Sequence, residues 1–184
     1  MNNALRIAFL CLACGVYGGE RPYELVWANR THDDHPALVP FTQANGWTVV
    51  CERASATLTT STNVLLFGEG TVQLTYRALD QKPFIRLEPC QPIAFTQRFD
   101  AVSCWVYGNN HSYAPDAKTP PVNVALNFAD AAGKPFSVNL ARVHFKEWFL
   151  CHRRLDAQLI PRVARGATLL SLTVTNGRNA EERA

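Results

Sequence analysis

Charged side chains are scarce in this chain of 184 residues. Asp, Glu, Lys and Arg together make up 18% of it, apolar residues make up 47%, and the net charge is only +3. So large an apolar share excludes a wholly disordered chain. The basic residues are scattered, apart from residues 152–154 and the pair Arg162 and Arg165, so the basic patch of a nucleic-acid-binding protein is lacking. We expect one globular domain with no nucleic-acid partner.

The sequence also lacks the short motifs of common active sites. It contains no G-x-S-x-G, H-E-x-x-H, P-loop or G-x-G-x-x-G sequence. No spacing argument brings two acidic residues to the roughly 5 to 9 Å of a glycosidase pair. The acidic residues considered for such a pair are Asp100, Asp116, Asp130 and Glu147. We therefore expect a protein that is not an enzyme and has no cofactor, with a glycoside hydrolase or lyase as the least favoured alternative.

Metal sites have equally little support. Residues 20–184 contain no C-x-x-C pair and no Cys/His spacing of a structural zinc site. The H-D-D-H run at residues 32–35 holds enough donor atoms for a divalent ion. Neighbouring residues of an extended chain point to opposite sides, however, which prevents the donors from converging. We interpret this run as a solvated loop and expect no metal.

The apolar run at residues 7–16 is too short for a membrane-spanning helix, which needs roughly 20 residues. Arg6 precedes it, and Gly18 and Gly19 follow it. A basic residue, an apolar stretch and then small residues form the order of a secretory signal peptide. We predict a signal peptide over residues 1–19 and an extracellular, periplasmic or cell-surface location. Cys14 leaves open a lipoprotein.

Four cysteines lie after the predicted signal peptide and allow three pairings. They are Cys51, Cys90, Cys104 and Cys151. Cys104 and Cys151 both lie in strongly patterned β segments, so in an oxidising compartment they could meet across neighbouring strands. The alternative is that all four are small, buried thiols.

Helical periodicity is absent from the first half of the chain, and short β segments separated by turns take its place. At residues 72–76, Val72, Leu74 and Tyr76 alternate with polar neighbours, and residues 122–128 alternate in the same way. Gly133 predicts a hairpin turn after the second of these segments. About ten such strands predict an all-β, antiparallel β-sandwich over residues 20–179, followed by a frayed tail at residues 180–184.

One short helix is predicted near residues 156–165. Asp156 is a candidate N-cap, Leu159 and Val163 share a face, and Gly166 is a stop signal. Pro161 lies beyond the first turn, where proline costs roughly 3 kcal/mol. The helix is therefore expected to have only one or two turns.

Residues 99–179 resemble the galactose-binding-like, β-sandwich carbohydrate-binding modules of secreted bacterial glycoside hydrolases and lyases. The resemblance depends on the segments FDAVSCWVYGNN, NFADAAGKPFSVNLARV, KEWFLCHRRL and SLTVTNGRN. It implies a jelly-roll sandwich and a glycan or polysaccharide partner, with a catalytic domain adjoining the module. Such modules usually continue into a final strand with an Asp that helps to bind calcium, whereas this chain ends with EERA. No calcium site is carried over.

The resemblance implies a secreted, non-catalytic carbohydrate-binding module. A structural or interaction sandwich of a cell-surface protein is the alternative. Sugar binding needs aromatic faces together with amides and carboxylates on a stiff frame. The loop at residues 108–121 has this mixture and contains three prolines. Its candidate ligand-binding residues are Asn109, Asn110, His111, Tyr113 and Asp116; the alternative is a solvated connection between two strands.

The remaining aromatic and basic candidates are interpreted as structural. Trp105 and Trp148 lie within apolar strands and are predicted to be buried in the core. Trp27 and Trp47 lie near strand ends and are expected to be more exposed. The basic residues 152–154 could bind acidic sugars, but a charged strand edge that prevents aggregation is the favoured interpretation.

Overall fold

The structure, a computed structural model, describes residues 37–68, 70–108, 122–175 and 182–183. The predicted signal peptide lies outside these residues. The described chain consists of strands and two 3-10 helices, and no α-helix occurs within it. No helix in this part of the chain is long and apolar enough to cross a membrane.

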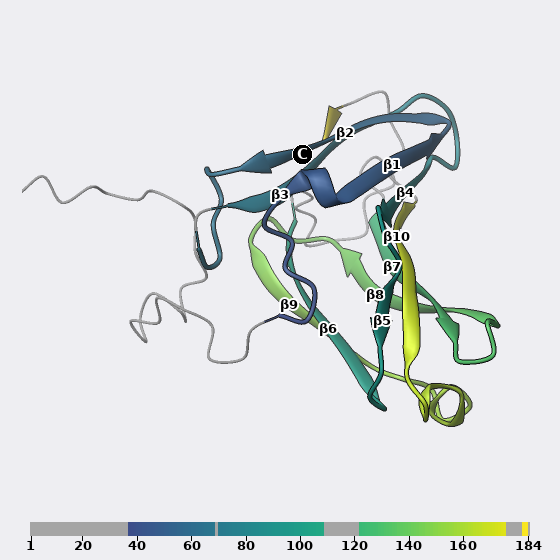
Figure 1. The fold of residues 1–184 in the computed structure, drawn as a ribbon. Helices are drawn as coiled ribbons and strands as arrows, with labels where there is room; N and C mark the ends of the chain where they lie inside the picture. Colours follow the sequence, from purple (N-terminus) through teal and green to yellow (C-terminus); the bar gives the residue numbers. More distant parts are fainter. Residues whose placement is uncertain (1–36, 69, 109–121, 176–181, 184) are drawn as a thin grey trace, which may run out of the picture.

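Eleven antiparallel strands make up the described fold (Figure 1). In chain order they are β1 (Trp47–Glu52), β2 (Ala54–Ser61), β3 (Thr71–Ala78), β4 (Phe84–Pro89), β5 (Ile93–Phe95), β6 (Ala101–Tyr107), β7 (Val122–Asp130), β8 (Pro135–Val143), β9 (Trp148–Arg154), β10 (Ala167–Thr175) and β11 (Glu182–Arg183). The 3-10 helices are η1 (Ala44–Gly46) and η2 (Ile160–Val163).

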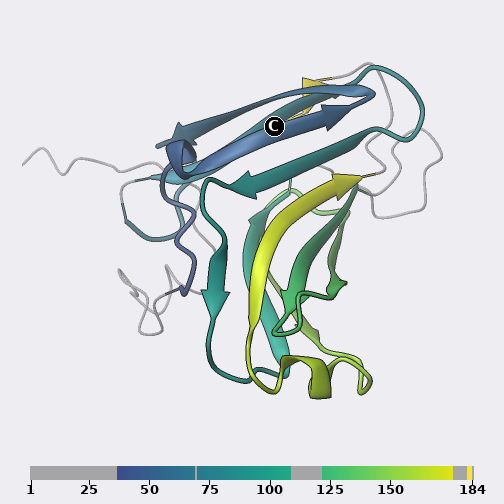
Figure 2. The same ribbon diagram turned by 45° about the vertical axis from the view of Figure 1, so that its right-hand side comes forward.

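The strands form three sheets. The main sheet has the order β1-β4-β10-β7-β8, and β5 also pairs with β10. The other two are the β2–β3 sheet, to which β11 is added, and the two-stranded β6–β9 sheet. In both ribbon views the β6–β9 sheet faces the lower half of the main sheet, and the β2–β3 sheet lies beside its β1–β4 end (Figures 1 and 2). This all-β sandwich confirms the predicted fold class.

The core lies against one face of the main sheet. On β7, Val122, Val124, Leu126 and Phe128 are all buried, as the alternation at residues 122–128 predicts. Phe128 stacks on Phe136 of β8, with their ring centroids 5.3 Å apart. Burying a side chain of this size contributes roughly 1.5 to 3 kcal/mol, so the β7–β8 hairpin supplies a large share of the core.

The turn of this hairpin is held by the side chain of Asp130. Its Oδ1 accepts hydrogen bonds from the backbone N–H groups of Ala132 (3.1 Å) and Lys134 (2.9 Å). Its Oδ2 accepts a hydrogen bond from Nε of Arg162 at 2.8 Å, and the Arg162 guanidinium also lies over the Phe136 ring. Gly133 has φ +77°, as predicted. These contacts connect η2 to the hairpin.

The helix predicted at residues 156–165 is present only as the four-residue 3-10 helix η2. Asp156 is not its N-cap: that position is Leu159, and no side chain caps the helix. Pro161 lies at the start of η2, where its missing N–H leaves no hydrogen bond unmade. The helix therefore begins beside the proline instead of four residues earlier. Gly166 follows it with φ +86°.

The last strand lies within the segment that was expected to fray. Glu182 pairs with Arg77, and Arg183 pairs with Tyr76, both on β3. These two residues therefore add a short third strand to the β2–β3 sheet. A frayed tail would have left this edge of β3 unpaired. In the structure β11 pairs with part of that edge.

Replacing Asp130 with Asn is expected to destabilise the protein at neutral pH. Hydrogen bonds from the Lys134 backbone and the Arg162 side chain hold the pKa of the Asp130 carboxyl below its usual value. A lowered pKa stabilises the fold above the unfolded value of about 3.9, and this contribution is lost as the pH falls through the folded pKa. The difference in urea midpoint between wild type and Asp130→Asn should be large at pH 7 and should shrink below about pH 4.

Asp156→Asn is the matched control for this experiment. Asp156 is exposed, and its side chain makes no hydrogen bond or ion pair with the described residues. Its midpoint should therefore follow that of the wild type at both pH values. A difference for Asp130→Asn that stays constant with pH would contradict the proposed role of the carboxylate.

Candidate binding site

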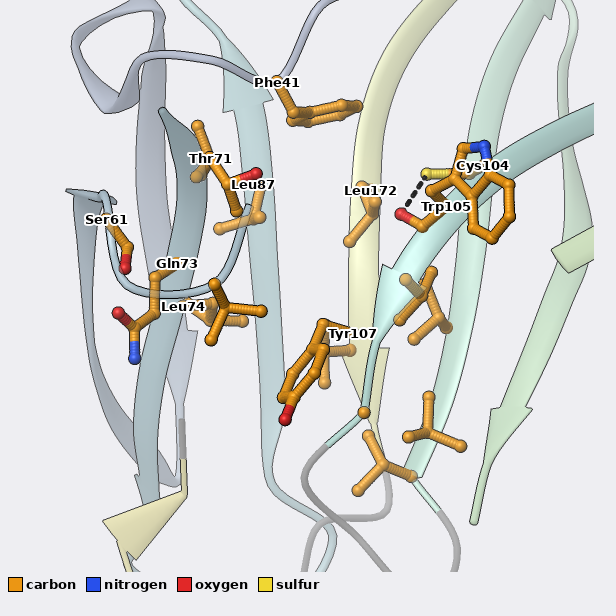
Figure 3. A pocket seen from close by; sticks show the side chains of 18 of the residues that line it. Phe41, Ser61, Thr71, Gln73, Leu74, Leu87, Cys104, Trp105, Tyr107 and Leu172 are labelled. Carbon is orange, nitrogen blue, oxygen red and sulfur yellow. Dashed lines mark hydrogen bonds between the residues drawn. The ribbon is translucent and has the colours of Figure 1, made fainter. Parts of the chain in front are cut away.

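A cavity of about 500 Å³ lies between the β2–β3 sheet and the β6–β9 sheet (Figure 3). Among the described residues, β3 and β6 are not hydrogen-bonded to each other, so the layer opposite the main sheet is interrupted here. Binding pockets for small molecules have volumes of roughly 300 to 1,000 Å³. The interruption therefore creates a space of the size that a ligand needs.

The floor of the cavity is apolar and comes from three neighbouring strands of the main sheet. Leu87 lies on β4, Val122 and Val124 on β7, and Leu172 and Val174 on β10. All five are buried. They lie on neighbouring strands because β10 pairs with both β4 and β7. The floor is therefore a rigid, continuous part of the core.

The walls carry the polar groups. On the side of β2 and β3, Ser61, Thr71 and Gln73 line the cavity. On the opposite side the exposed residue Lys146 lines the cavity. Phe41 lies at one end of the view in Figure 3 and stacks on Trp47, with the ring centroids 4.6 Å apart. Polar residues are thus found on both sides of an apolar floor.

Two aromatic side chains from neighbouring strands line the cavity on its β6 side. Tyr107 of β6 lies opposite Trp148 of β9, and their ring centroids are 5.6 Å apart at 71°. The backbone hydrogen bonds of Gly108 to Glu147 and of Leu155 to Asp100 define the hydrogen-bonded positions of this ladder. Because such positions alternate, Tyr107 and Trp148 are a non-hydrogen-bonded pair, with Cα atoms about 4.5 Å apart. The register therefore places the two rings in contact.

Gly108 allows β6 to end at the cavity. A Cβ at this position would overlap the backbone oxygen and the ring of Phe145. The backbone N–H of Gly108 donates to Glu147 at 3.1 Å. Only glycine permits so close a passage of the two segments, which holds the end of β6 against the start of β9.

The indole N–H of Trp148 lacks a hydrogen-bond acceptor among the described residues. The nitrogen itself, Nε1, is buried. An unpartnered buried donor costs about 1 to 3 kcal/mol, and such groups in a folded protein call for an explanation. Trp148 lines the cavity, but this nitrogen is closed off from it, so a ligand could reach the donor only after a movement of the side chain.

Trp105 and Trp148 were predicted to be core residues, and this prediction is wrong. Both are half-buried and line the cavity. The prediction assumed that β6 is a central strand with neighbours on both sides. Within the described chain β6 pairs only with β9, so its second edge is open and the side chains beside that edge are only partly covered. Trp47, expected to be more exposed, is also half-buried and packs against the core, while Trp27 lies outside the described residues.

The binding residues predicted in the loop, Asn109, Asn110, His111, Tyr113 and Asp116, lie outside the described residues. The two residues that flank this segment, Gly108 and Val122, both line the cavity. The cavity itself was missed by the sequence interpretation. The available signal was the alternation of Trp105 and Tyr107 on one face of β6, with Trp148 in the segment that became its partner.

The other candidates from the sequence lie elsewhere. His152, Arg153 and Arg154 are exposed at the end of β9, and His152 Nδ1 lies 2.8 Å from Ser103 Oγ. None of these three lines the cavity. The described chain contains no cluster of three or more His, Cys, Asp or Glu residues that could hold a metal, and the H-D-D-H run lies outside it.

Among the described acidic candidates, the structure separates Asp100 from Glu147. Asp130 is held at the β7–β8 turn by Arg162. Asp100 and Glu147 lie at opposite ends of the β6–β9 ladder. At about 3.4 Å per residue their backbones are roughly 27 Å apart. These carboxylates are therefore not a pair, while Asp116 lies outside the described residues.

The chain has the fold of the carbohydrate-binding modules of the β-sandwich superfamily. It superimposes on one such module, whose structure was solved to explain the promiscuous specificity of these modules. The TM-score is 0.54 and the sequence identity is 12%. The superposition covers 84% of this chain but only 59% of that one. The likeness confirms the sandwich that the sequence resemblance implies.

Two further solved structures are similar at lower scores. One is the module TmCBM61 in complex with β-1,4-galactotriose, with 18% identity, coverage of 77% and 83% of the two chains and a TM-score of 0.44. The other is the enzymatically active domain of tailspike protein 4 of bacteriophage CBA120, with 11% identity, coverage of 77% and 19%, and a TM-score of 0.41. No family model and no curated protein sequence matches the chain.

Proposed function

We propose that the protein binds a glycan in the cavity between β3 and β6. The observation that carries the proposal is the pair of Tyr107 and Trp148 in this cavity, together with the unpartnered Nε1 of Trp148. Aromatic rings present a flat apolar surface to the C–H face of a sugar, and a polar handle beside them orients its hydroxyl groups. The fold, which is that of known carbohydrate-binding modules, supports the proposal.

Each group of the cavity has a defined role in this proposal. The rings of Tyr107 and Trp148 contact the C–H surface of a sugar ring. Nε1 of Trp148, which is buried in this structure, donates to a hydroxyl or ring oxygen after the indole has moved toward the ligand. Lys146 adds a positive charge that favours a glycan with hydroxyl or carboxylate acceptors. The apolar floor excludes water from beneath the sugar.

We further propose that the protein acts by binding alone and is exported, as a module that can adjoin a catalytic domain. Aromatic, amide and hydroxyl groups of the kind that line the cavity bind sugars without cleaving them. The basic, apolar and small segments at residues 1–19 support export. A glycoside hydrolase or lyase remains the competing function, because it would use the same substrate.

Affinity electrophoresis through gels that contain soluble polysaccharides tests the proposed binding. We expect at least one neutral or acidic polysaccharide to retard the folded protein, and calorimetric titration with oligosaccharides of that polymer to give saturable binding. Release of reducing ends during the same incubation would assign the hydrolase instead. No retardation by any polysaccharide, with the fold verified by circular dichroism, would exclude the proposed function.

A further inference from the structure

Two cysteines are direct partners across the β6–β9 ladder. Cys104 of β6 lies opposite Cys151 of β9, and both side chains lie on the face of this sheet that packs against the core. All four described cysteines are free thiols in this structure. Pairing of Cys104 with Cys151 was one of the arrangements that the sequence left open, and the register now places the two residues side by side.

The spacing of this pair suits a covalent bond. The hydrogen bonds at the two ends of the ladder, from Leu155 to Asp100 and from Gly108 to Glu147, place Cys104 and Cys151 in a hydrogen-bonded position. The Cα atoms of such a pair are about 5.5 Å apart. Disulfides span Cα separations of roughly 4.4 to 6.8 Å, so the Cα spacing of this pair is within range. The Cβ atoms of a hydrogen-bonded pair are roughly 5.5 Å apart, so the two strands must approach by about 1 Å for the bond to form.

The other two described cysteines, Cys51 and Cys90, are too far apart to form a disulfide with each other. Cys51 lies opposite Ile85 in the β1–β4 ladder, and Cys90 lies five residues beyond Ile85. At about 3.4 Å per residue, Cys51 and Cys90 are roughly 17 Å apart. Cys90 is also exposed, whereas Cys151 is buried with 4% of its surface accessible.

We propose that Cys104 and Cys151 form a disulfide that joins β6 to β9 beneath the aromatic pair. The two thiols lose two protons and two electrons, and a new S–S bond forms through a mixed disulfide. A disulfide oxidant of the glutathione type accepts the electrons and is released as two thiols. The proposal is independent of the glycan-binding function.

The environment of the pair determines when the bond forms. Burial and the neighbouring Cys151 raise the pKa of the Cys104 thiol to about 11, and burial also raises the pKa of Cys151. The thiolate is the reactive species, so both thiols react slowly once the sheet is packed. We expect the bond to form during folding, before these side chains are buried, and to resist reduction afterwards.

The bond would stabilise the least supported sheet of the fold. The β6–β9 sheet has two strands and shares no backbone ladder with the other described sheets. Two-stranded sheets are marginally stable by themselves. A bond between residues 104 and 151 also closes a long loop in the unfolded chain, which stabilises the folded state by reducing the entropy of the unfolded one.

The test uses the full chain in which every cysteine except Cys104 and Cys151 is changed to Ser. The variant is refolded in a buffer of oxidised and reduced glutathione and then unfolded in the presence of N-ethylmaleimide. We expect an intact mass lower than that of the dithiol by two hydrogen atoms and no maleimide adduct. The oxidised form should melt about 10 °C higher than the same protein after reduction. Two maleimide adducts after oxidation, or a lower melting temperature, would overturn the proposal.

A second measurement does not depend on that variant folding. The wild-type chain is oxidised in the same way, alkylated and digested without reduction, and its linked peptides are identified by mass spectrometry. Among the four cysteines after residue 19, we expect one linked pair, Cys104 with Cys151. The matched control C104S/C151S should leave Cys51 and Cys90 fully alkylated. Linkage of Cys51 or Cys90 to either partner in the wild type would contradict the assignment.

Discussion

Replacing Trp148 with Ala is expected to weaken glycan binding about 30-fold. The change removes one ring of the pair with Tyr107, whose centroid lies 5.6 Å away, and it removes the indole N–H proposed to donate to the ligand. Truncation of a central aromatic side chain in a binding site costs about 2 kcal/mol or more, which corresponds to roughly a 30-fold change in affinity. Calorimetric titration with the oligosaccharide identified by affinity electrophoresis measures the change.

Trp148→Phe separates the contribution of the indole N–H to the affinity from the contribution of the aromatic ring. It keeps an aromatic face but removes Nε1, which is buried and has no partner within the described part of the chain. Losing one hydrogen bond should lower the affinity by about 1 kcal/mol, or roughly fivefold. The unfolding free energy of the unliganded protein should stay within about 1 kcal/mol of wild type, because removal of an unpartnered donor offsets the lost packing of the larger ring. Affinity and stability should therefore respond differently to this substitution.

Trp47→Phe is the matched control for Trp148→Phe, because phenylalanine keeps a ring against Phe41, the cavity residue on which Trp47 stacks. Trp47 is half-buried, as Trp148 is, but it does not line the cavity. Its replacement should leave the affinity unchanged. If Trp148→Ala binds as tightly as wild type while remaining folded, the site is not in this cavity. If Trp47→Phe weakens binding as much as Trp148→Phe does, the effect is general and not local.

Replacing Gly166 with Ala is expected to destabilise the protein by about 3 to 5 kcal/mol, through two effects. Gly166 has φ +86°, which costs an L-residue roughly 1 to 2 kcal/mol. A Cβ at this position would also overlap the backbone oxygen of Phe95 on β5. Since β5 pairs with β10 immediately after Gly166, relief of the overlap requires a shift of one of these strands. Chemical unfolding monitored by tryptophan fluorescence measures the loss.

Gly133→Ala distinguishes these two effects. Gly133 has a similar φ of +77°, but a Cβ there would meet nothing within 4 Å. Only the conformational cost of roughly 1 to 2 kcal/mol applies. Gly166→Ala should therefore be clearly less stable than Gly133→Ala. Equal losses for the two variants would show that the contact with Phe95 is unimportant.

Much of the β structure could be predicted from local patterns. The alternation at residues 122–128 identified the buried face of β7, because a strand with one face against a core must alternate. Gly133 identified the hairpin turn for a similar local reason. Pro161 predicted that the helix would be short, and the structure contains only the four-residue 3-10 helix η2 there. Each of these features depends on residues that are neighbours in the sequence.

The candidate site could not be predicted in the same way. Trp105 and Trp148 are surrounded in the sequence by apolar residues, as core residues typically are. Their exposure depends on how many neighbouring strands pair with β6. That number is decided by strands distant in the sequence. The register that brings Tyr107 to Trp148 joins segments some forty residues apart, and the cavity exists because β3 and β6 are not paired. The sequence interpretation therefore placed the site in the loop after Tyr107 and overlooked the strand that ends there.

The amino-acid sequence by itself determined the fold class, the hairpin of β7 and β8 and the positions where glycine is needed for a turn, because these follow from local periodicity and backbone sterics. The tertiary structure decided which side chains line a cavity, which two cysteines face each other and why Gly166 has no room for a side chain. These three properties depend on distances between residues far apart in the chain. Such distances follow from how the sheets pair and pack, which local patterns do not specify.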